Sequence, residues 1–300
     1  MIEDGKPGLE FCVTEVYCPS MRNLRTHWCL PFLAVMLLCC GTSIYAKSTN
    51  IRFKQLPRTV IRHDLDSFAY SNIAREAELS QLFHQAGCTP AEISREWVRR
   101  HDPPNIICTL PGKSSSTIIV SAHTDHVDLG IGVVDDWSGA ALLPALIQSL
   151  ADTPRRHTFV FVGFTDEEKG LVGSKYYVWH LSRAQVSHIS AEVNLECLGL
   201  TRTKVWAARA NKQLLSDLIN VARSLKLNLQ GVDVGDVGDD DTHSFLWRNI
   251  PVITIHSVTQ KTWPILHSTR DNLSAVNFND YYNSYQLIAA YLAYLDVALK

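Results

Sequence analysis

The chain has 300 residues, enough for one large domain or two small ones, and its apolar content of 46% is ordinary for a globular protein. Its formal net charge is −2, and no segment concentrates Lys and Arg. Because proteins that bind phosphate backbones use clustered cations, these properties argue against nucleic acid as a partner.

The N-terminal extension, residues 1–46, has the pattern of a secretory signal peptide. A basic flank at residues 22–27 precedes an apolar run at residues 29–41, and the extension ends at Ala46. Met21 is an alternative start. The apolar run is shorter than a bilayer span requires, so we expect no membrane span in the mature chain. The pattern predicts a secreted or periplasmic protein, with an uncleaved N-terminal membrane anchor as the alternative.

The mature chain is predicted to be one domain that begins after an irregular lead-in at residues 47–64. Apolar residues at helical spacing predict a helix over 67–87. Short apolar runs separated by turn residues or by amphipathic segments predict the later elements. The expected strands cover residues 105–110, 117–121, 157–164, 189–195, 205–207 and 250–256, and the expected helices cover 138–150, 170–181, 212–225 and 279–299.

Strands that alternate with helices predict parallel crossovers and a sheet covered on both faces. The expected fold class is therefore α/β, with a mixed, mostly parallel central sheet in a single domain over residues 65–300. Sequence patterns give no indication of the oligomeric state.

Removal of the leader takes away five of the eight cysteines and leaves Cys88, Cys108 and Cys197. Cys88 and Cys108 can pair in an oxidising compartment, which leaves Cys197 over. The chain has no Cys-x-x-Cys pattern, so a thiolate metal site has no support.

Acidic residues and a histidine follow the ends of the predicted strands. His123 and Asp125 follow one strand, Glu167 and Glu168 follow another, and Glu196 follows a third. In α/β sheets the carboxyl ends of the strands form the functional edge. So many acids in one cleft need a neutralising cation, and imidazole with carboxylate ligands suits zinc.

Five short motifs carry a family resemblance. They are Ser-Ala-His123-Thr-Asp125, Val-Asp135-Asp136-Trp-Ser-Gly139, Phe-Thr-Asp166-Glu167-Glu168-Lys-Gly-Leu-Val-Gly-Ser174, Asn194-Leu-Glu196 and His267-Ser-Thr-Arg-Asp271. In this order they resemble the aminopeptidase Y and bacterial leucyl aminopeptidase family of zinc exopeptidases. Relatives of that family include glutamate carboxypeptidase and glutaminyl cyclase. The resemblance covers residues 65–298.

The resemblance implies two zinc ions per chain. His123 and Glu196 would hold one ion, Glu168 and His267 would hold the other, and Asp135 would bridge them. The position of Glu196 is commonly Asp in this family. The extra methylene shifts the carboxylate by about a bond length and can alter the occupancy of that site.

Other acids would support the metals or the substrate. Glu167 would be the general base, and Asp125 would accept the proton from the second nitrogen of His123. Asp136 would support the metal ligands or face the substrate, and Asp136 or Glu168 would add negative potential for the amino terminus of a substrate. Asp241 would support the site or face the substrate, although Thr242 stands where the family often has His. Trp263 is expected either in the pocket or in the core.

The predicted function is a zinc-dependent aminopeptidase that hydrolyses N-terminal residues from peptides. The first alternative is a glutaminyl cyclase, which needs one zinc ion and transfers an acyl group intramolecularly. A non-catalytic binding domain on the same fold is the second. A carboxypeptidase would need cationic residues for a substrate carboxylate, and the sequence pattern places none.

Overall fold

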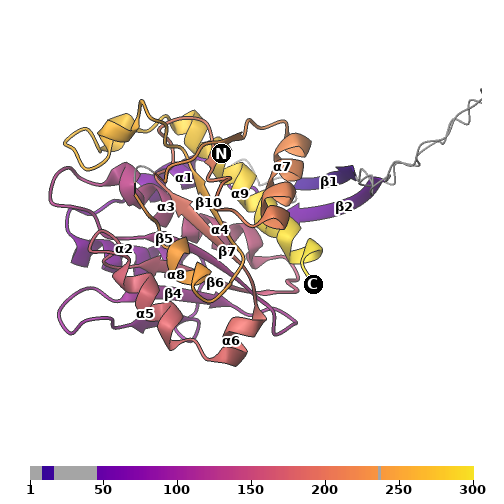
Figure 1. Cartoon of the computed structure of the whole chain (residues 1–300), viewed down its shortest axis with the longest axis horizontal. Helices are drawn as coiled ribbons and strands as arrows, with labels where there is room; N and C mark the ends of the chain where they lie inside the picture. Colours follow the sequence, from indigo (N-terminus) through magenta and orange to yellow (C-terminus); the bar gives the residue numbers. More distant parts are fainter. Residues whose placement is uncertain (1–8, 17–45, 236–237) are drawn as a thin grey trace, which may run out of the picture.

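The computed structural model describes residues 9–16, 46–235 and 238–300. Four parallel strands form the middle of an eight-stranded sheet of order β3-β4-β6-β5-β7-β10-β8-β9 (Figure 1). The four strands are β6 (Thr158–Phe164), β5 (Thr117–His123), β7 (Ile189–Glu196) and β10 (Val252–His256). Their largely apolar sequences suit strands that are buried on both faces.

Shorter strands extend the sheet on both sides of this parallel centre. They are β3 (Ile93–Glu96), β4 (Asn105–Leu110), β8 (Lys204–Val205) and β9 (Gln230–Gly231). β4 pairs antiparallel with both β3 and β6, and β8 pairs antiparallel with β10. The prediction of a mixed, mostly parallel sheet is therefore confirmed.

Helices cover both faces of the sheet, as predicted. One face packs against α1 (Arg58–Asp66), α2 (Asn72–Gln85), α4 (Leu142–Ala151), α7 (Lys212–Leu225) and α9 (Phe278–Ala298). The opposite face packs against α5 (Val172–His180), α6 (Arg183–His188) and α8 (Thr242–Leu246). Along β5 the side chains alternate, with Ile118 in one core and Ile119 in the other.

The lead-in at residues 47–64, which we expected to be irregular, instead contains a strand and a helix. β2 (Ala46–Phe53) pairs antiparallel with β1 (Leu9–Val16), and α1 follows. Ile61 and Leu65 are four residues apart and buried, so one side of α1 packs on the core. The many charged residues between them hide this spacing in the sequence.

Most other predicted elements occur with shifts of a few residues. The helix expected over 67–87 begins later, at Asn72, because the Ser71 side chain accepts a hydrogen bond from the Ala74 N–H and caps it. The helix expected over 138–150 consists of α3 (Ser138–Ala140) and α4. β3, α6 and α8 were not predicted, and all three have only four to six residues.

The predicted N-terminal leader, residues 1–46, lies outside the described residues except for residues 9–16 and Ala46, and it stays a prediction. Within the described ranges, no helix combines the length and the apolar character that a bilayer span needs. Cys88 and Cys108 form a disulfide that joins the end of α2 to β4, while Cys197 is a buried free thiol.

Candidate metal centre

The parallel strands deliver five potential metal ligands to one edge of the sheet. His123 ends β5, Glu196 ends β7, and Glu168 follows β6. Asp135 lies in the loop between β5 and α3, and His267 lies in the loop after β10. Residues far apart in the sequence thus meet because parallel strands end at the same edge (Figure 1).

His123 is the centre of the first group of ligands. Its Nε2 atom lies 3.1 Å from Oδ1 of Asp135 and 3.5 Å from Oε1 of Glu196. The imidazole is only 1% exposed. One nitrogen and two carboxylate oxygens therefore face one point, which is the arrangement of ligands around a cation.

His267 is the centre of the second group. Its Nε2 atom lies 3.1 Å from Oδ2 of Asp135 and 3.0 Å from Oε2 of Glu168. The two oxygens of Asp135 therefore face two different imidazoles. This placement is the one that a bridging ligand between two metals requires.

The surrounding acids raise the pKa of both histidines. Burial alone lowers the pKa of His123, but the surrounding carboxylates, with Glu167 the strongest, hold it well above the usual 6.5. Hydrogen bonds to Asp135 and Glu168 raise the pKa of His267 to about 10. Both shifts reflect the negative potential of the clustered carboxylates, which favours a cation at this point.

The side chains fit divalent cations. Three groups of residues place one ligand atom each within 4.8 Å of one another. They are Asp135, Glu168 and His267; Asp135, Glu196 and Cys197; and His123, Asp136 and Glu196. Oε1 of Glu168 is buried without a hydrogen-bond partner among the described residues. Imidazole nitrogens with carboxylate oxygens are the ligands that zinc takes in catalytic sites.

Glu167 lies beside the two groups rather than within them. Burial raises the pKa of its carboxyl well above the usual 4.5; His123 opposes this shift, while the acidic Asp241 and Glu196 add to it. Its side chain lines the same cavity as Glu168 and His267. A free carboxyl at this position can exchange protons with a bound molecule.

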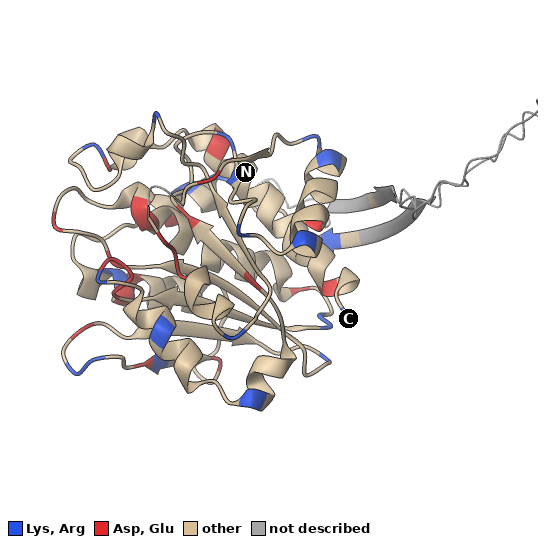
Figure 2. Ribbon diagram, in the orientation of Figure 1, with Lys and Arg blue, Asp and Glu red and all other residues tan. Residues whose placement is uncertain are grey.

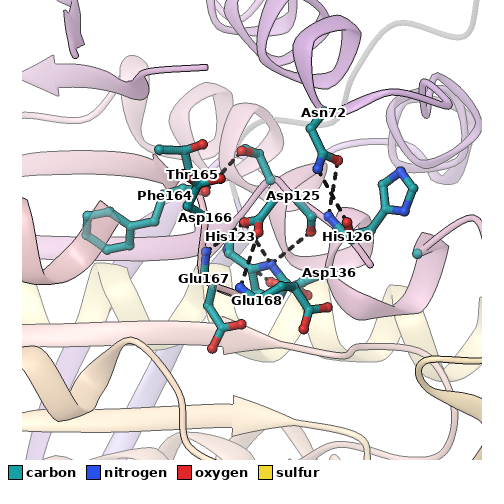
Figure 3. Close-up of polar contacts among 12 residues, drawn as sticks. Asn72, His123, Asp125, His126, Asp136, Phe164, Thr165, Asp166, Glu167 and Glu168 are labelled. Carbon is teal, nitrogen blue, oxygen red and sulfur yellow. Dashed lines mark hydrogen bonds and ion pairs between the residues drawn. The ribbon is translucent and has the colours of Figure 1, made fainter. Parts of the chain in front are cut away.

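The Asp125 carboxylate supports the turn that carries both glutamates (Figure 3). It accepts hydrogen bonds from the backbone N–H of Glu167 at 2.9 Å and of Glu168 at 3.2 Å. Nδ1 of His123 lies 3.0 Å from the carbonyl oxygen of Asp125 but 3.6 Å from its carboxylate. The closer acceptor for Nδ1 of His123 is therefore the backbone oxygen of Asp125 rather than the expected carboxylate, because the carboxylate is occupied by the turn.

The carboxylate of Asp136 faces backbone groups rather than the cavity. It is fully buried and accepts hydrogen bonds from the backbone N–H of His123, Gly139 and Cys197. It thereby joins three segments that carry ligands. The Asp136 carboxylate lies so close to the backbone of residue 139 that only glycine fits there, because a Cβ atom would lie 2.5 Å from Oδ2 of Asp136.

Asp241 is also fully buried and lies outside the cavity. Neither of its carboxylate oxygens has a hydrogen-bond partner among the described residues. Burial, opposed by Ser174, raises its pKa to about 7. Asp241 therefore does not face the open cavity, and it acts on Glu167 through its charge, which adds to the raised pKa of that residue.

A cavity of about 280 Å³ opens beside the ligands. Both acidic and apolar side chains line it, and Trp263 is one of the lining residues. The apolar lining residues are Leu171, Trp206, Val234, Val258, Trp263 and Leu266. Figure 2 shows acidic segments gathered at the strand ends, whereas Lys and Arg are spread mainly over the outer helices and loops.

Two residues that hold the Asp135 loop were not among the predicted site residues. The Asp271 carboxylate accepts hydrogen bonds from the backbone N–H of Val134 at 2.7 Å and of Asp135 at 3.2 Å. The buried Arg75 guanidinium donates to the carbonyl oxygens of Thr124, Ile131 and Gly132. Asp271 ends a motif that was recognised, whereas Arg75 has no signal in its surrounding sequence.

Comparison with known proteins gives matches in sequence and in structure. Residues 105–292 match the model of peptidase family M28. The chain is 32% identical over 92 residues to aminopeptidase YwaD from Bacillus subtilis, and 36% identical over 98 residues to leupeptin-inactivating enzyme 1 from Streptomyces exfoliatus. These alignments cover 31% and 32% of this chain but only 20% and 22% of the relatives.

Solved structures share the fold at lower identity. A zinc aminopeptidase from Bacillus subtilis superposes with a TM-score of 0.59 at 22% identity, over 66% of this chain and 50% of that chain. The LapA aminopeptidase of Legionella pneumophila gives 0.67 at 20% identity, over 81% and 71%. A glutaminyl cyclase from Porphyromonas gingivalis gives 0.63 at 18% identity, over 78% and 95%.

The family model covers more than half of the chain and includes the strand ends that carry the five potential ligands. The chain belongs to peptidase family M28.

Proposed function

We propose that the protein is a zinc-dependent aminopeptidase with two metal ions per chain. The observation that carries the proposal is the position of Asp135, whose two oxygens face the Nε2 atoms of His123 and His267 at 3.1 Å each. Glu196 would complete one site and Glu168 the other. The names of the sequence relatives, which include leucine aminopeptidases, support the same reading.

Zinc bound in such a site acts as a Lewis acid and lowers the pKa of water toward neutrality. Glu167 takes a proton from the attacking water and returns it to the leaving nitrogen of the peptide. The Asp125 carboxylate accepts hydrogen bonds from the backbone N–H of Glu167 at 2.9 Å and of Glu168 at 3.2 Å. These bonds fix the turn, so that the side chains of the base and of the neighbouring ligand point in different directions. Asp135 and Asp136, in one loop, have separate roles as ligand and backbone support.

The cavity defines the expected substrate. The apolar lining residues suit an uncharged N-terminal side chain, and the acidic lining residues attract the protonated amine of a peptide. We therefore expect faster release from leucine or phenylalanine amides than from aspartate amides. A panel of aminoacyl amides measures this preference.

The substitution Glu167→Gln tests the assignment of the base. It removes proton transfer while keeping size and shape, so kcat is expected to fall about 10²–10⁴-fold. Zinc content, measured by atomic absorption, is expected to stay unchanged. The control is Asp152→Asn, because that side chain is 75% exposed and belongs to a surface ion pair with Lys54. Undiminished turnover in Glu167→Gln would exclude Glu167 as the base.

Glutaminyl cyclase activity is the second candidate. The fold favours it, because glutaminyl cyclases from Porphyromonas gingivalis and Fimbriiglobus ruber superpose over 95% and 98% of their own lengths. Incubation with a peptide that begins with glutamine separates the two candidates. Cyclised product with one bound zinc supports the cyclase, and amide hydrolysis with two bound zinc ions supports the aminopeptidase.

A secreted or periplasmic location belongs to the same proposal. The Cys88–Cys108 disulfide supports it, because such bonds persist in oxidising compartments. N-terminal sequencing of the exported protein tests cleavage of the leader near residue 46.

A further inference from the structure

A line of polar side chains runs from the interior of the sheet to the proposed metal ligand Glu196. Glu192, Asn194 and Glu196 alternate along β7 and so share one face of it. Ser121 of β5 lies opposite Asn194 in the parallel register. Ser121, Glu192 and Asn194 are all fully buried.

Hydrogen bonds connect these four side chains in sequence. The Ser121 hydroxyl oxygen lies 2.6 Å from Oε1 of Glu192 and 3.0 Å from Oδ1 of Asn194. Nδ2 of Asn194 lies 3.3 Å from Oε2 of Glu196. The line therefore ends on the oxygen of Glu196 that does not face His123, because Oε1 is the atom 3.5 Å from the imidazole.

The number of protons available to these side chains decides which group donates in each hydrogen bond. A metal ligand at position 196 is a carboxylate, so it accepts a hydrogen bond from the amide N–H of Asn194. The amide oxygen of Asn194 then accepts the single proton of the Ser121 hydroxyl. Glu192 is left to donate to the hydroxyl oxygen across 2.6 Å, and it can do so only as a protonated acid.

The surroundings of Glu192 also favour a neutral acid. Among the described residues, the Oε2 atom of Glu192 has no hydrogen-bond partner, and Glu192 belongs to no ion pair. The charged groups that act on it, Asp240 and Asp241, are acidic. A buried carboxylate without a cation is far more costly than a buried carboxylic acid.

We propose that Glu192 is a positioning residue that, as a neutral acid, orients Glu196 through Ser121 and Asn194. The inference rests on the proposed function, because it takes Glu196 as a ligand. Glu has one more rotatable bond than the Asp that is common at this position in the family, and the hydrogen-bonded line restrains that extra freedom. Oε1 of Glu196 is thereby kept toward His123.

Zinc titration by calorimetry tests the inference in four variants. Glu192→Leu and Ser121→Ala break the line and are expected to weaken binding of one of the two zinc ions about 10–100-fold. Glu192→Gln keeps a donor for Ser121 and is expected to bind both ions like the wild type. Ser149→Ala is the control, because it removes a buried hydroxyl that bonds to Ala145 and Tyr285 in a different part of the core.

The outcomes separate this inference from the proposed function. A wild-type chain that binds no zinc overturns both. Two bound ions with unchanged affinity in Glu192→Leu, or equal losses in Glu192→Gln and Glu192→Leu, overturn only the role of Glu192.

Infrared spectroscopy tests the protonation of Glu192 without a destabilising variant. The wild-type spectrum is expected to contain a carbonyl band of a protonated carboxyl group that Glu192→Gln lacks. Identical spectra in this region would overturn the inference.

Discussion

Buried carboxylates in this protein fall into two chemical groups. Asp135, Glu168 and Glu196 face imidazoles and are available to a cation. Asp125 and Asp136 instead accept backbone N–H groups from the segments that carry those ligands. Residue identity alone does not separate the groups, since both consist of acids at strand ends; the direction of each side chain does.

The substitution Gly139→Ala tests the role of Asp136. The new Cβ atom would lie 2.5 Å from Oδ2 of Asp136 and 2.8 Å from the carbonyl oxygen of Leu195. We expect a loss of about 1–3 kcal/mol in the free energy of unfolding, because the backbone must shift to make room.

Urea unfolding measures this loss, and Gly238→Ala is the matched control, because no heavy atom lies within 4 Å of its added Cβ. Equal stability of the two variants would show that the contact between Gly139 and Asp136 is not important.

The sequence was sufficient to propose the five candidate ligands and a supporting role for Asp125, but not the roles of Arg75 and Glu192. The five ligands lie in motifs that a known family shares. Arg75, by contrast, contacts three carbonyl oxygens 49 to 57 residues away, and nothing within α2 marks it. Glu192 lies in an apolar strand, where its polar partners become visible only once β5 and β7 are paired.

At the scale of elements, the centre of the fold was predictable because its strands are long apolar runs. α7 has the bounds expected from periodicity, since Asn211 caps its start and Lys226 ends it in a left-handed conformation. The β1–β2 pair escaped prediction because two strands that pair across about 30 intervening residues show no local signal.

The end of α9 is joined to the start of β6 by one carboxylate. Asp296 accepts hydrogen bonds from the backbone N–H of Arg156 and His157 and lies 3.2 Å from Nδ1 of His157. Burial alone raises the pKa of Asp296, but these partners outweigh burial and lower it below 3.8. The contribution to stability is therefore present above the unfolded-state pKa and is lost as the pH falls through the folded-state value.

The substitution Asp296→Asn is expected to lower the free energy of unfolding by about 1–3 kcal/mol at pH 7. The difference from the wild type should begin to shrink as the pH falls below the unfolded-state pKa of about 3.9, and it should be lost as the pH passes the lower folded-state pKa. Urea unfolding at several pH values measures this, with Asp152→Asn as the exposed control. A difference that stays constant down to pH 3 would show that the charge of Asp296 is not responsible.

At the scale of the whole molecule, bound zinc should stabilise the fold. A ligand that binds only the folded chain adds about 4 kcal/mol at a concentration 1,000 times its Kd. In a domain of this size that corresponds to a rise in Tm of roughly 8–16 °C. Calorimetry with and without a chelator measures the change.

The substitution Glu168→Gln removes one proposed ligand and should reduce the response of Tm to zinc. A wild-type Tm that is the same with and without zinc would contradict a metal centre made by these residues.

The five candidate ligands end or follow the four strands β5, β6, β7 and β10, so the proposed metal centre joins the loops beyond these strands. Sheet hydrogen bonds hold β5, β6, β7 and β10 along their length, but the loops beyond them meet chiefly through side chains. Loss of the cations should therefore loosen that rim while the body of the sheet remains closed. Amide hydrogen exchange would then become faster in the loops and stay slow in α9. The protein without metal would therefore remain folded, with local opening confined to the loops at this edge of the sheet.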